Sequence, residues 1–122
     1  MKLSCLLAVM ISLSACVLPS KQELATGKQL SFQRNKGNCL ACHVIEDGID
    51  PGNIGPALIE IPQKFASKSA LKAVIWDASA FNSQTSMPPF GRNKILTSEE
   101  LDLVVNYIWS LSGAVQPVSK EW

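Results

Sequence analysis

Two cysteines and a histidine lie close together in this chain, as Cys39, Cys42 and His43. On a helical turn, thiols three positions apart lie along one edge, where each can add to one vinyl group of a haem. The adjacent imidazole can then ligate the haem iron. This spacing is typical of c-type haem attachment, and it predicts one covalently bound haem.

Two other kinds of site also use a Cys-x-x-Cys pair. A structural zinc site needs four protein ligands, but His43 is the only histidine and the remaining cysteines, Cys5 and Cys16, lie in the N-terminal apolar segment. A thioredoxin-like redox pair expects a strand–helix–strand context, which the sequence of residues 30–60 does not indicate. Haem attachment is therefore favoured over both.

The second axial ligand of the iron has few candidates. Ligation by two histidines is excluded within this chain, which has only one. Of the three methionines, Met1 and Met10 lie in the N-terminal segment, which leaves Met87. Two prolines follow Met87 and stiffen its loop. We predict Met87 as the ligand. Ligation by Lys94, or a methionine that only packs in the core, are the alternatives.

The N-terminal segment predicts export. Lys2 is followed by an apolar stretch, residues 3–13, that is too short to span a bilayer. Its end, Leu13-Ser14-Ala15-Cys16, resembles a bacterial lipobox. We interpret residues 1–15 as a lipoprotein-type signal peptide, with cleavage before Cys16 and lipid attached there. Ordinary cleavage without lipid, or an uncleaved anchor, are the alternatives.

Composition limits the class of partner. The 122 residues include eleven basic and ten acidic side chains, which become equal in number when Lys2 leaves with the signal peptide. A neutral chain of this size forms one small domain and gives no reason to expect nucleic acid. We expect no nucleic-acid partner.

Helical patterns dominate the mature chain, so we predict an all-α domain. The expected elements are a helix over residues 21–36, a turn over 58–61, and helices over 69–77 and from 98 to Gly113. Ser69 is the expected N-cap of the third, and Thr97 with Glu100 forms a capping box for the last. Gly27 interrupts the first helix, which indicates either close approach of another helix or tolerance on an exposed face.

Over residues 23–112 the order of these features resembles the class I cytochromes c. They share an N-terminal helix, the Cys-x-x-Cys-His motif, a Gly-Pro pair (here Gly55-Pro56), a methionine loop and a C-terminal helix. The resemblance implies that the carbonyl of Pro56 accepts a hydrogen bond from the free ring N–H of His43, which orients the imidazole. A plain turn proline is the alternative. The implied division is a signal peptide at 1–15, a lead at 16–22, a cytochrome c domain at 23–115 and a tail at 116–122.

Four sequence runs carry a more specific resemblance. They are residues 36–43, Gly52-Asn53-Ile54-Gly55-Pro56, Ile75-Trp76-Asp77, and Met87-Pro88-Pro89-Phe90-Gly91 followed by Ile95-Leu96-Thr97. Together they resemble SoxX, the monohaem subunit of the SoxAX complex of bacterial sulfur oxidation. That complex joins thiosulfate oxidatively to a cysteine of a sulfur-carrier protein and releases two electrons. The resemblance implies a SoxA-type partner with the reactive haem, and a small soluble cytochrome c as electron acceptor.

The implied role is that of an electron-transfer subunit of an L-cysteine S-thiosulfotransferase, without a catalytic residue of its own. Haem attachment consumes Cys39 and Cys42, and two axial ligands leave no open iron position. A free-standing electron shuttle, or a subunit of another respiratory complex, is the alternative. The expected location is the periplasm, with membrane attachment if Cys16 is lipidated.

Further side chains each allow two interpretations. The aromatic candidates either line the haem or pack in the core; they are Trp76, Phe90, Tyr107 and Trp109. The basic candidates either bind a haem propionate or a partner, or are simply solvated; they are Arg92 and Lys94 for the propionate, and Lys64, Lys68 and Lys72 for a docking strip.

Overall fold

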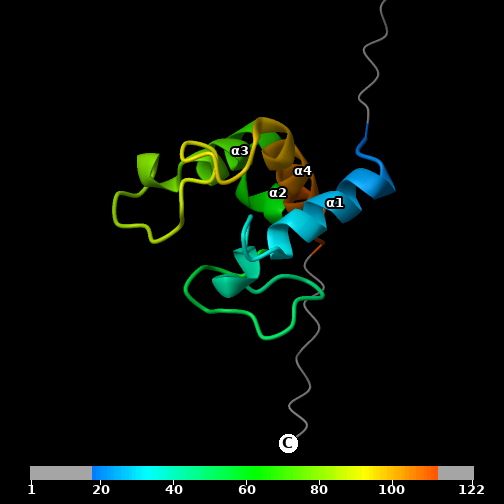
Figure 1. Cartoon of the computed structure of the whole chain (residues 1–122), viewed down its shortest axis with the longest axis horizontal. Helices are drawn as coiled ribbons and strands as arrows, with labels where there is room; N and C mark the ends of the chain where they lie inside the picture. Colours follow the sequence, from blue (N-terminus) through cyan, green and yellow to red (C-terminus); the bar gives the residue numbers. More distant parts are fainter. Residues whose placement is uncertain (1–17, 113–122) are drawn as a thin grey trace, which may run out of the picture.

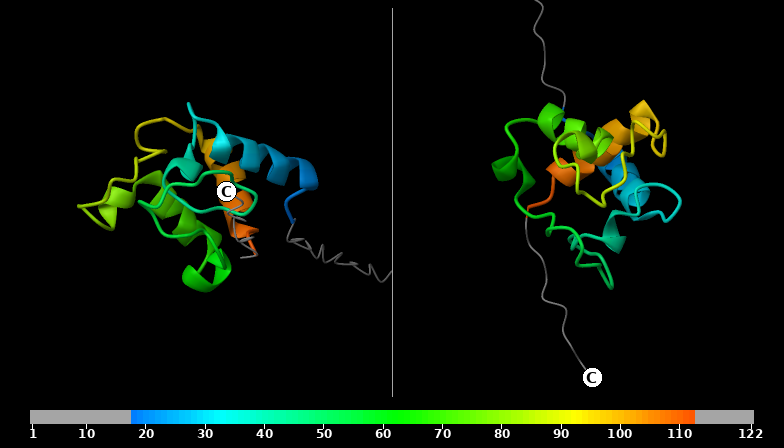
Figure 2. Two further views of the ribbon diagram at one scale, coloured as in Figure 1. Left: turned by 90° about the horizontal axis from the view of Figure 1, so that it is seen from below. Right: turned by 90° about the vertical axis from the view of Figure 1, so that its left-hand side faces the viewer.

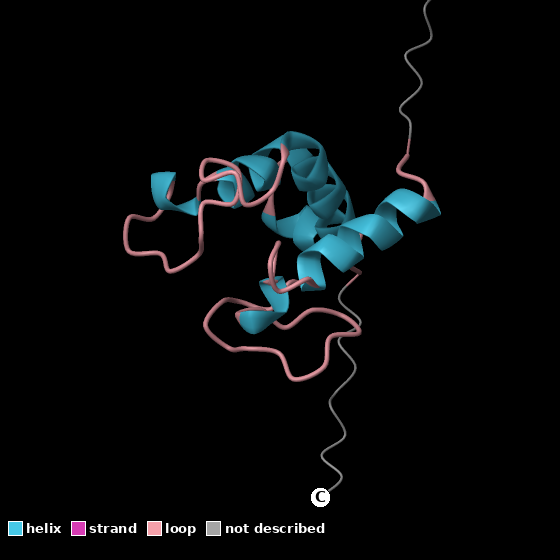
Figure 3. Ribbon diagram, viewed as in Figure 1, coloured by secondary structure: helices cyan, strands magenta, loops and turns pink. Residues whose placement is uncertain are grey.

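The computed structural model describes residues 18–112, and these form helices and loops without a strand (Figure 3). The predicted all-α fold is confirmed. The helices are α1 (Lys21–Phe32), α2 (Ile61–Lys64), α3 (Lys68–Trp76) and α4 (Ser98–Trp109), with 3₁₀ turns η1 (Cys39–Ala41) and η2 (Ala78–Ala80). No helix in residues 18–112 is long and apolar enough to cross a bilayer. The predicted signal peptide, Cys16 and the C-terminal tail lie outside the described residues.

Helices α1 and α4 cross and pack against each other more extensively than any other pair of elements in the described part (Figure 1). Gly27 lies at this crossing. A Cβ atom there would be 2.2 Å from the carbonyl oxygen of Leu103 and 2.8 Å from the Cβ of Tyr107. The two backbones approach so closely that only glycine fits, which confirms the close-approach interpretation of Gly27.

The hydrophobic core extends from the helices into the loops. Tyr107 of α4 meets Phe32 of α1 edge to face, with ring centroids 6.3 Å apart. Loop residues Ile45 and Phe90 are buried in the same cluster, so both long loops are fastened to the helices by apolar contact. The buried members are Leu30, Ile45, Ile61, Leu71, Ile75, Phe90, Leu96, Leu101, Val104, Val105, Tyr107, Ile108 and Leu111.

Helix α1 is shorter than predicted at its C-terminal end. It ends at Phe32 because the chain then turns back, and the N–H of Gly37 donates to the carbonyl of Leu30 at 3.0 Å. At its start, the hydroxyl of Ser20 accepts from the N–H of Glu23, and the Glu23 carboxylate accepts from the N–H of Ser20. This capping box is readable in the sequence as Ser-x-x-Glu, although we did not predict it.

Two further helix starts differ from the prediction. Helix α3 is capped by Ser67, whose hydroxyl accepts from the N–H of Ala70, and not by Ser69. Helix α2 includes Pro62, where we had expected a turn to end. Proline is compatible with a first helical turn because no N–H is needed there. Helix α4 begins at the predicted capping box and ends at Trp109; Gly113 lies outside the described residues.

The start of α4 is joined to the segment before the cysteine motif. Lys36 Nζ lies 2.7 Å from Glu100 Oε1, and Glu100 Oε2 accepts from the N–H of Thr97 at 2.9 Å. Both contacts lower the pKa of Glu100, and the contact with Lys36 has the larger effect. The ionised carboxylate of Glu100 therefore stabilises the folded protein. This contribution is fully present above the ordinary glutamate pKa of about 4.3, and it is lost as the pH falls through the lower pKa of the folded state.

We therefore expect Glu100→Gln to lower the free energy of unfolding at pH 7 by about 1 kcal/mol, because the ion pair and part of the cap are lost. The deficit should shrink as the pH falls toward 3, where the wild-type carboxyl becomes neutral too. Denaturant unfolding at several pH values measures this, with Glu99→Gln as the matched control. A deficit that stayed constant across this range would contradict the assignment.

Candidate functional site

The Cys-x-x-Cys-His motif lies on the turn η1, directly after the bend that ends α1. The N–H groups of Cys42 and His43 both donate to the carbonyl of Cys39, at 3.2 and 2.9 Å. These bonds wind both cysteines onto one turn, and both are free thiols. Asn38 precedes them with φ of 48°, a left-handed conformation that asparagine tolerates better than most residues. The local structure thus presents two thiols and an imidazole together.

The imidazole of His43 is held by the loop that follows. Its Nδ1 lies 2.6 Å from the carbonyl oxygen of Pro56. A carbonyl only accepts hydrogen bonds, so Nδ1 is the donor and Nε2 of the neutral ring carries the free lone pair. The N–H of Gly55 donates to the carbonyl of Cys42 at 2.8 Å, and a Cβ at Gly55 would lie 2.3 Å from His43 Cε1. The loop therefore fixes the ring and leaves Nε2 available to a metal.

Two more backbone bonds tie the same loop to the motif. The N–H of Gly52 donates to the carbonyl of Leu40, and the N–H of Leu58 to that of Val44, both at 2.8 Å. The views in Figure 2 show this loop running beside η1. The segment from residue 47 to 58 is therefore held against the motif by backbone hydrogen bonds, although it contains no regular secondary structure.

The thiol of Cys39 faces the protein interior. Burial raises the pKa of the Cys39 thiol to about 11. Before haem attachment the thiol is therefore protonated at neutral pH. The fully buried Ser31 was missed by the sequence reasoning. Its position four residues after Gly27, on the same face of α1, is the signal that could have identified it.

Met87 lies on a different loop, between η2 and α4. It is half-buried and packs against the hydrophobic core, and its N–H donates to the hydroxyl of Thr85 at 3.1 Å. The chain after it is fastened to the end of α3, because the N–H groups of Gly91 and Arg92 both donate to the carbonyl of Trp76 at 3.2 Å. The methionine is thus presented from a loop that is anchored on its C-terminal side.

The structure gathers four of the predicted site residues into one unit, namely Cys39, Cys42, His43 and Pro56. It places the loop of Met87 elsewhere, on the side of α3, while the loop after η1 lies below α1 (Figure 1). The two loops meet the helical core from different directions, and each contributes a buried residue to it, Ile45 and Phe90.

The basic side chains proposed for docking bind within the chain. Lys68 donates to the side-chain oxygen of Asn106 at 2.8 Å, and Lys72 pairs with Asp102 at 2.5 Å. Both partners belong to α4, so these two lysines connect α3 to α4. The contacts favour a structural role for Lys68 and Lys72 over a role in docking. Lys64 donates to a backbone carbonyl, that of Ala57.

The other edge residues also have partners in the chain. Arg92 pairs with Asp77 at 2.9 Å, next to the Trp76–Gly91 contact. Phe90 is buried in the core, Trp109 is half-buried, and Trp76 remains 45 % exposed. Lys94 is exposed and has φ of 55°. The core interpretation therefore holds for Phe90.

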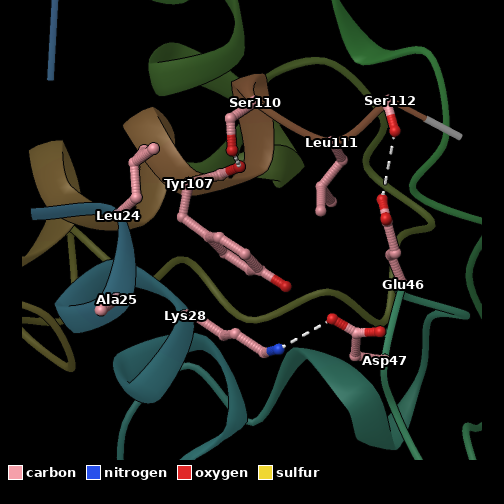
Figure 4. Close-up of a pocket in the computed structure, with 9 residues that line it drawn as sticks. All are labelled: Leu24, Ala25, Lys28, Glu46, Asp47, Tyr107, Ser110, Leu111 and Ser112. Carbon is pink, nitrogen blue, oxygen red and sulfur yellow. Dashed lines mark hydrogen bonds and ion pairs between the residues drawn. The ribbon is translucent and has the colours of Figure 1, made fainter. Parts of the chain in front are cut away.

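Tyr107 is a core residue whose hydroxyl points into a pocket between α1, the end of α4 and residues 46–47 (Figure 4). Burial raises the pKa of Tyr107 to about 12. Lys28 pairs with Asp47 across this pocket at 3.1 Å, and Ser112 donates to Glu46 at 3.4 Å. The pocket is not lined by the cysteines of the motif, so it is separate from the candidate site.

No group of three or more histidine, cysteine or carboxylate side chains in residues 18–112 is arranged so that it could hold a metal ion by itself. In comparisons with known proteins, the family model described as cytochrome c matches residues 24–112. No curated protein matches the chain.

Proposed function

Because the chain belongs to the cytochrome c family, we propose that Cys39 and Cys42 carry its covalent haem c as two thioethers. Membership makes the protein a haem electron-transfer protein. The residues present fit the group. Both thiols are free on one turn, and the Pro56 contact leaves Nε2 of His43 available to iron. The missing side chain at Gly55 leaves room for the ring.

We propose His43 and Met87 as the two axial ligands. The bound haem supplies one-electron exchange at its iron. Pro56 orients the imidazole and strengthens it as a ligand by accepting a hydrogen bond from Nδ1–H of His43. The prolines after Met87 and the Trp76 contacts hold the thioether loop, which helps keep a weak bond to iron in both oxidation states.

Gly55→Ala should displace His43, because the new methyl group would overlap the imidazole. We expect a weaker bond between Pro56 and His43 and a clear fall in the yield of haem protein. The imidazole then donates less electron density to ferric iron, so the reduction potential should rise. The matched control is Gly48→Ala in the same loop, where the nearest atom is a flexible methyl group of Leu40. Equal effects of both variants on the potential would contradict the role of Gly55.

We further propose that the protein is the electron-accepting subunit of a SoxAX complex, which passes electrons from a SoxA-type partner to a small cytochrome c. The observation that carries this proposal is the sequence resemblance to SoxX. Two of the segments that carry the resemblance, residues 75–77 and 87–91, contact each other in the structure. A Cβ at Gly91 would lie 1.9 Å from the indole of Trp76, and Asp77 pairs with Arg92. These two runs therefore form one packed unit, which gives a physical reason for them to occur together.

Exposed apolar side chains support a protein partner. Ile49 and Ile54 are 81 % and 71 % exposed on the loop after the motif, and Phe81 is 65 % exposed after η2. Contiguous exposed apolar surface is typical of protein–protein contacts, and these side chains are the candidates for such a surface. We propose that a SoxA-type subunit covers at least one of these loops, and that the sulfur-carrier protein is reached through the complex.

The test of this role mixes the purified protein with thiosulfate, a sulfur-carrier protein and a candidate SoxA. We expect the haem to become reduced only when all components are present, because this chain has no catalytic residue of its own. Equal reduction without the candidate SoxA would favour a free-standing electron shuttle instead.

We propose a periplasmic location with a lipid at Cys16, since the segment before it resembles a lipobox. Detergent partition of the exported protein tests this. The wild type should enter the detergent phase, and Cys16→Ser should stay in the aqueous phase. Aqueous behaviour of the wild type would show that the mature protein carries no lipid.

A further inference from the structure

One carboxylate lies at the base of the loop that carries Met87. Asp77 follows the last residue of α3, and its side chain is only 14 % exposed. Its Oδ2 lies 2.9 Å from Nη1 of Arg92. Its Oδ1 accepts from the N–H of Ser79 at 3.1 Å and also from the Ser79 hydroxyl. The two oxygens of one side chain therefore hold both ends of the loop, at Ser79 and at Arg92.

The middle of the loop is shaped by local hydrogen bonds. The N–H of Gln84 donates to the side-chain oxygen of Asn82 at 3.0 Å, and the N–H of Thr85 to the carbonyl of Asn82 at 3.1 Å. The N–H of Met87 then donates to the Thr85 hydroxyl. Bonds between residues two or three positions apart shape a segment without fixing it against a helix. The placement of Met87 thus depends on how the ends of the loop are held.

The end at Arg92 is close to Met87, because only four residues separate them and two of these are prolines with a fixed φ. The next residue, Gly91, lies flat against the indole of Trp76, where a Cβ would be 1.9 Å from the nearest ring carbon. The N–H groups of Gly91 and Arg92 both donate to the Trp76 carbonyl at 3.2 Å. A displacement of Arg92 would therefore move this stiff segment, and Met87 with it.

We propose that Asp77 is a positioning residue for Met87, and that its carboxylate restrains the loop so that the thioether leaves the iron less often. This inference rests on the proposed axial role of Met87. Asp77 acts through the loop and is not itself a ligand. Loss of its carboxylate releases Ser79 and Arg92 together, whereas the backbone bonds to Trp76 remain and keep the loop attached. The loop should then open more often without unfolding.

The test is the rate at which imidazole replaces methionine in the ferric haem protein. Imidazole binds only while the iron position is open, so at saturating imidazole the observed rate equals the rate at which Met87 leaves. Stopped-flow absorption at the methionine-to-iron charge-transfer band follows this step. Asp77→Ala should raise the limiting rate about tenfold, and Arg92→Ala about threefold, because the half-exposed ion pair is only one of the contacts that Asp77 makes.

Two further variants separate the ends of the loop. In Asp77→Asn the amide oxygen can still accept from Ser79 while the ion pair is lost, so the rate should match that of Arg92→Ala. The double variant Asp77→Ala/Arg92→Ala should be no faster than Asp77→Ala alone, because both changes remove the same pair. Multiplied effects in the double variant would overturn the inference.

Asp102→Ala is the matched control. It removes the ion pair with Lys72, which also involves α3 but lies outside the Met87 loop. It should leave the limiting rate within about twofold of the wild type. An equal rise in Asp102→Ala and Asp77→Ala, or an Asp77→Ala rate equal to the wild-type rate, would overturn this inference alone. A wild type without the methionine band would overturn the axial assignment of Met87 as well.

Discussion

Met87→Ala is expected to abolish the methionine-to-iron charge-transfer band and to lower the reduction potential by on the order of 100 mV or more. The thioether is a soft ligand that favours ferrous iron. Without it, water or a lysine would take the position, and both favour ferric iron. Absorption spectra of the oxidised protein and a potentiometric titration measure the two effects.

Two control variants make this result specific. Pro88→Ala loosens the same loop but keeps the sulfur, so the band should remain. Lys94→Ala removes the competing ligand in the same loop, and the potential should not change. A band that persists in Met87→Ala would show that the axial assignment is wrong. A wild-type spectrum that changes in Lys94→Ala would identify the lysine as the ligand.

Gly27→Ala is expected to lower the free energy of unfolding by about 2–3 kcal/mol, because the added methyl group would overlap the backbone of Leu103. The sign of the change in the free energy of unfolding distinguishes the two interpretations of Gly27. Alanine is favoured over glycine in a helix interior by about 1 kcal/mol, so a glycine that was merely tolerated would give a more stable variant. Denaturant unfolding of the haem protein measures the difference.

The control for this variant is Gln29→Ala, an exposed position of α1. It should leave the stability within about 0.5 kcal/mol of the wild type. If Gly27→Ala proved as stable as this control, the close crossing of α1 and α4 would not exist in solution.

Features that depend on neighbours in sequence were predicted well. The capping box at Thr97 and the apolar spacing of α4 lie within one segment, and the structure has both. The helix over residues 69–77 was recognised too, but its cap is Ser67, since two serines close together offer the same signal. Gly27 allowed two interpretations, because its partner Leu103 is distant in sequence.

Features that depend on distant segments were not predicted from local patterns. Lys68 and Lys72 resembled a solvated or docking strip, but their partners come from α4. The position of Ser31 one turn after Gly27 indicates the face of α1 on which it lies, but its full burial could not be predicted because the later bend at Gly37 packs against it. The contact between His43 and Pro56 was implied by family resemblance and not by spacing.

For the haem itself, the decisive measurement is the mass of the denatured, purified full-length protein after export, with the absorption spectrum of its pyridine complex. We expect one haem, covalently added to the peptide that contains Cys39, Cys42 and His43. A colourless protein, or a polypeptide mass without the haem, would contradict this and would leave the two cysteines as a dithiol.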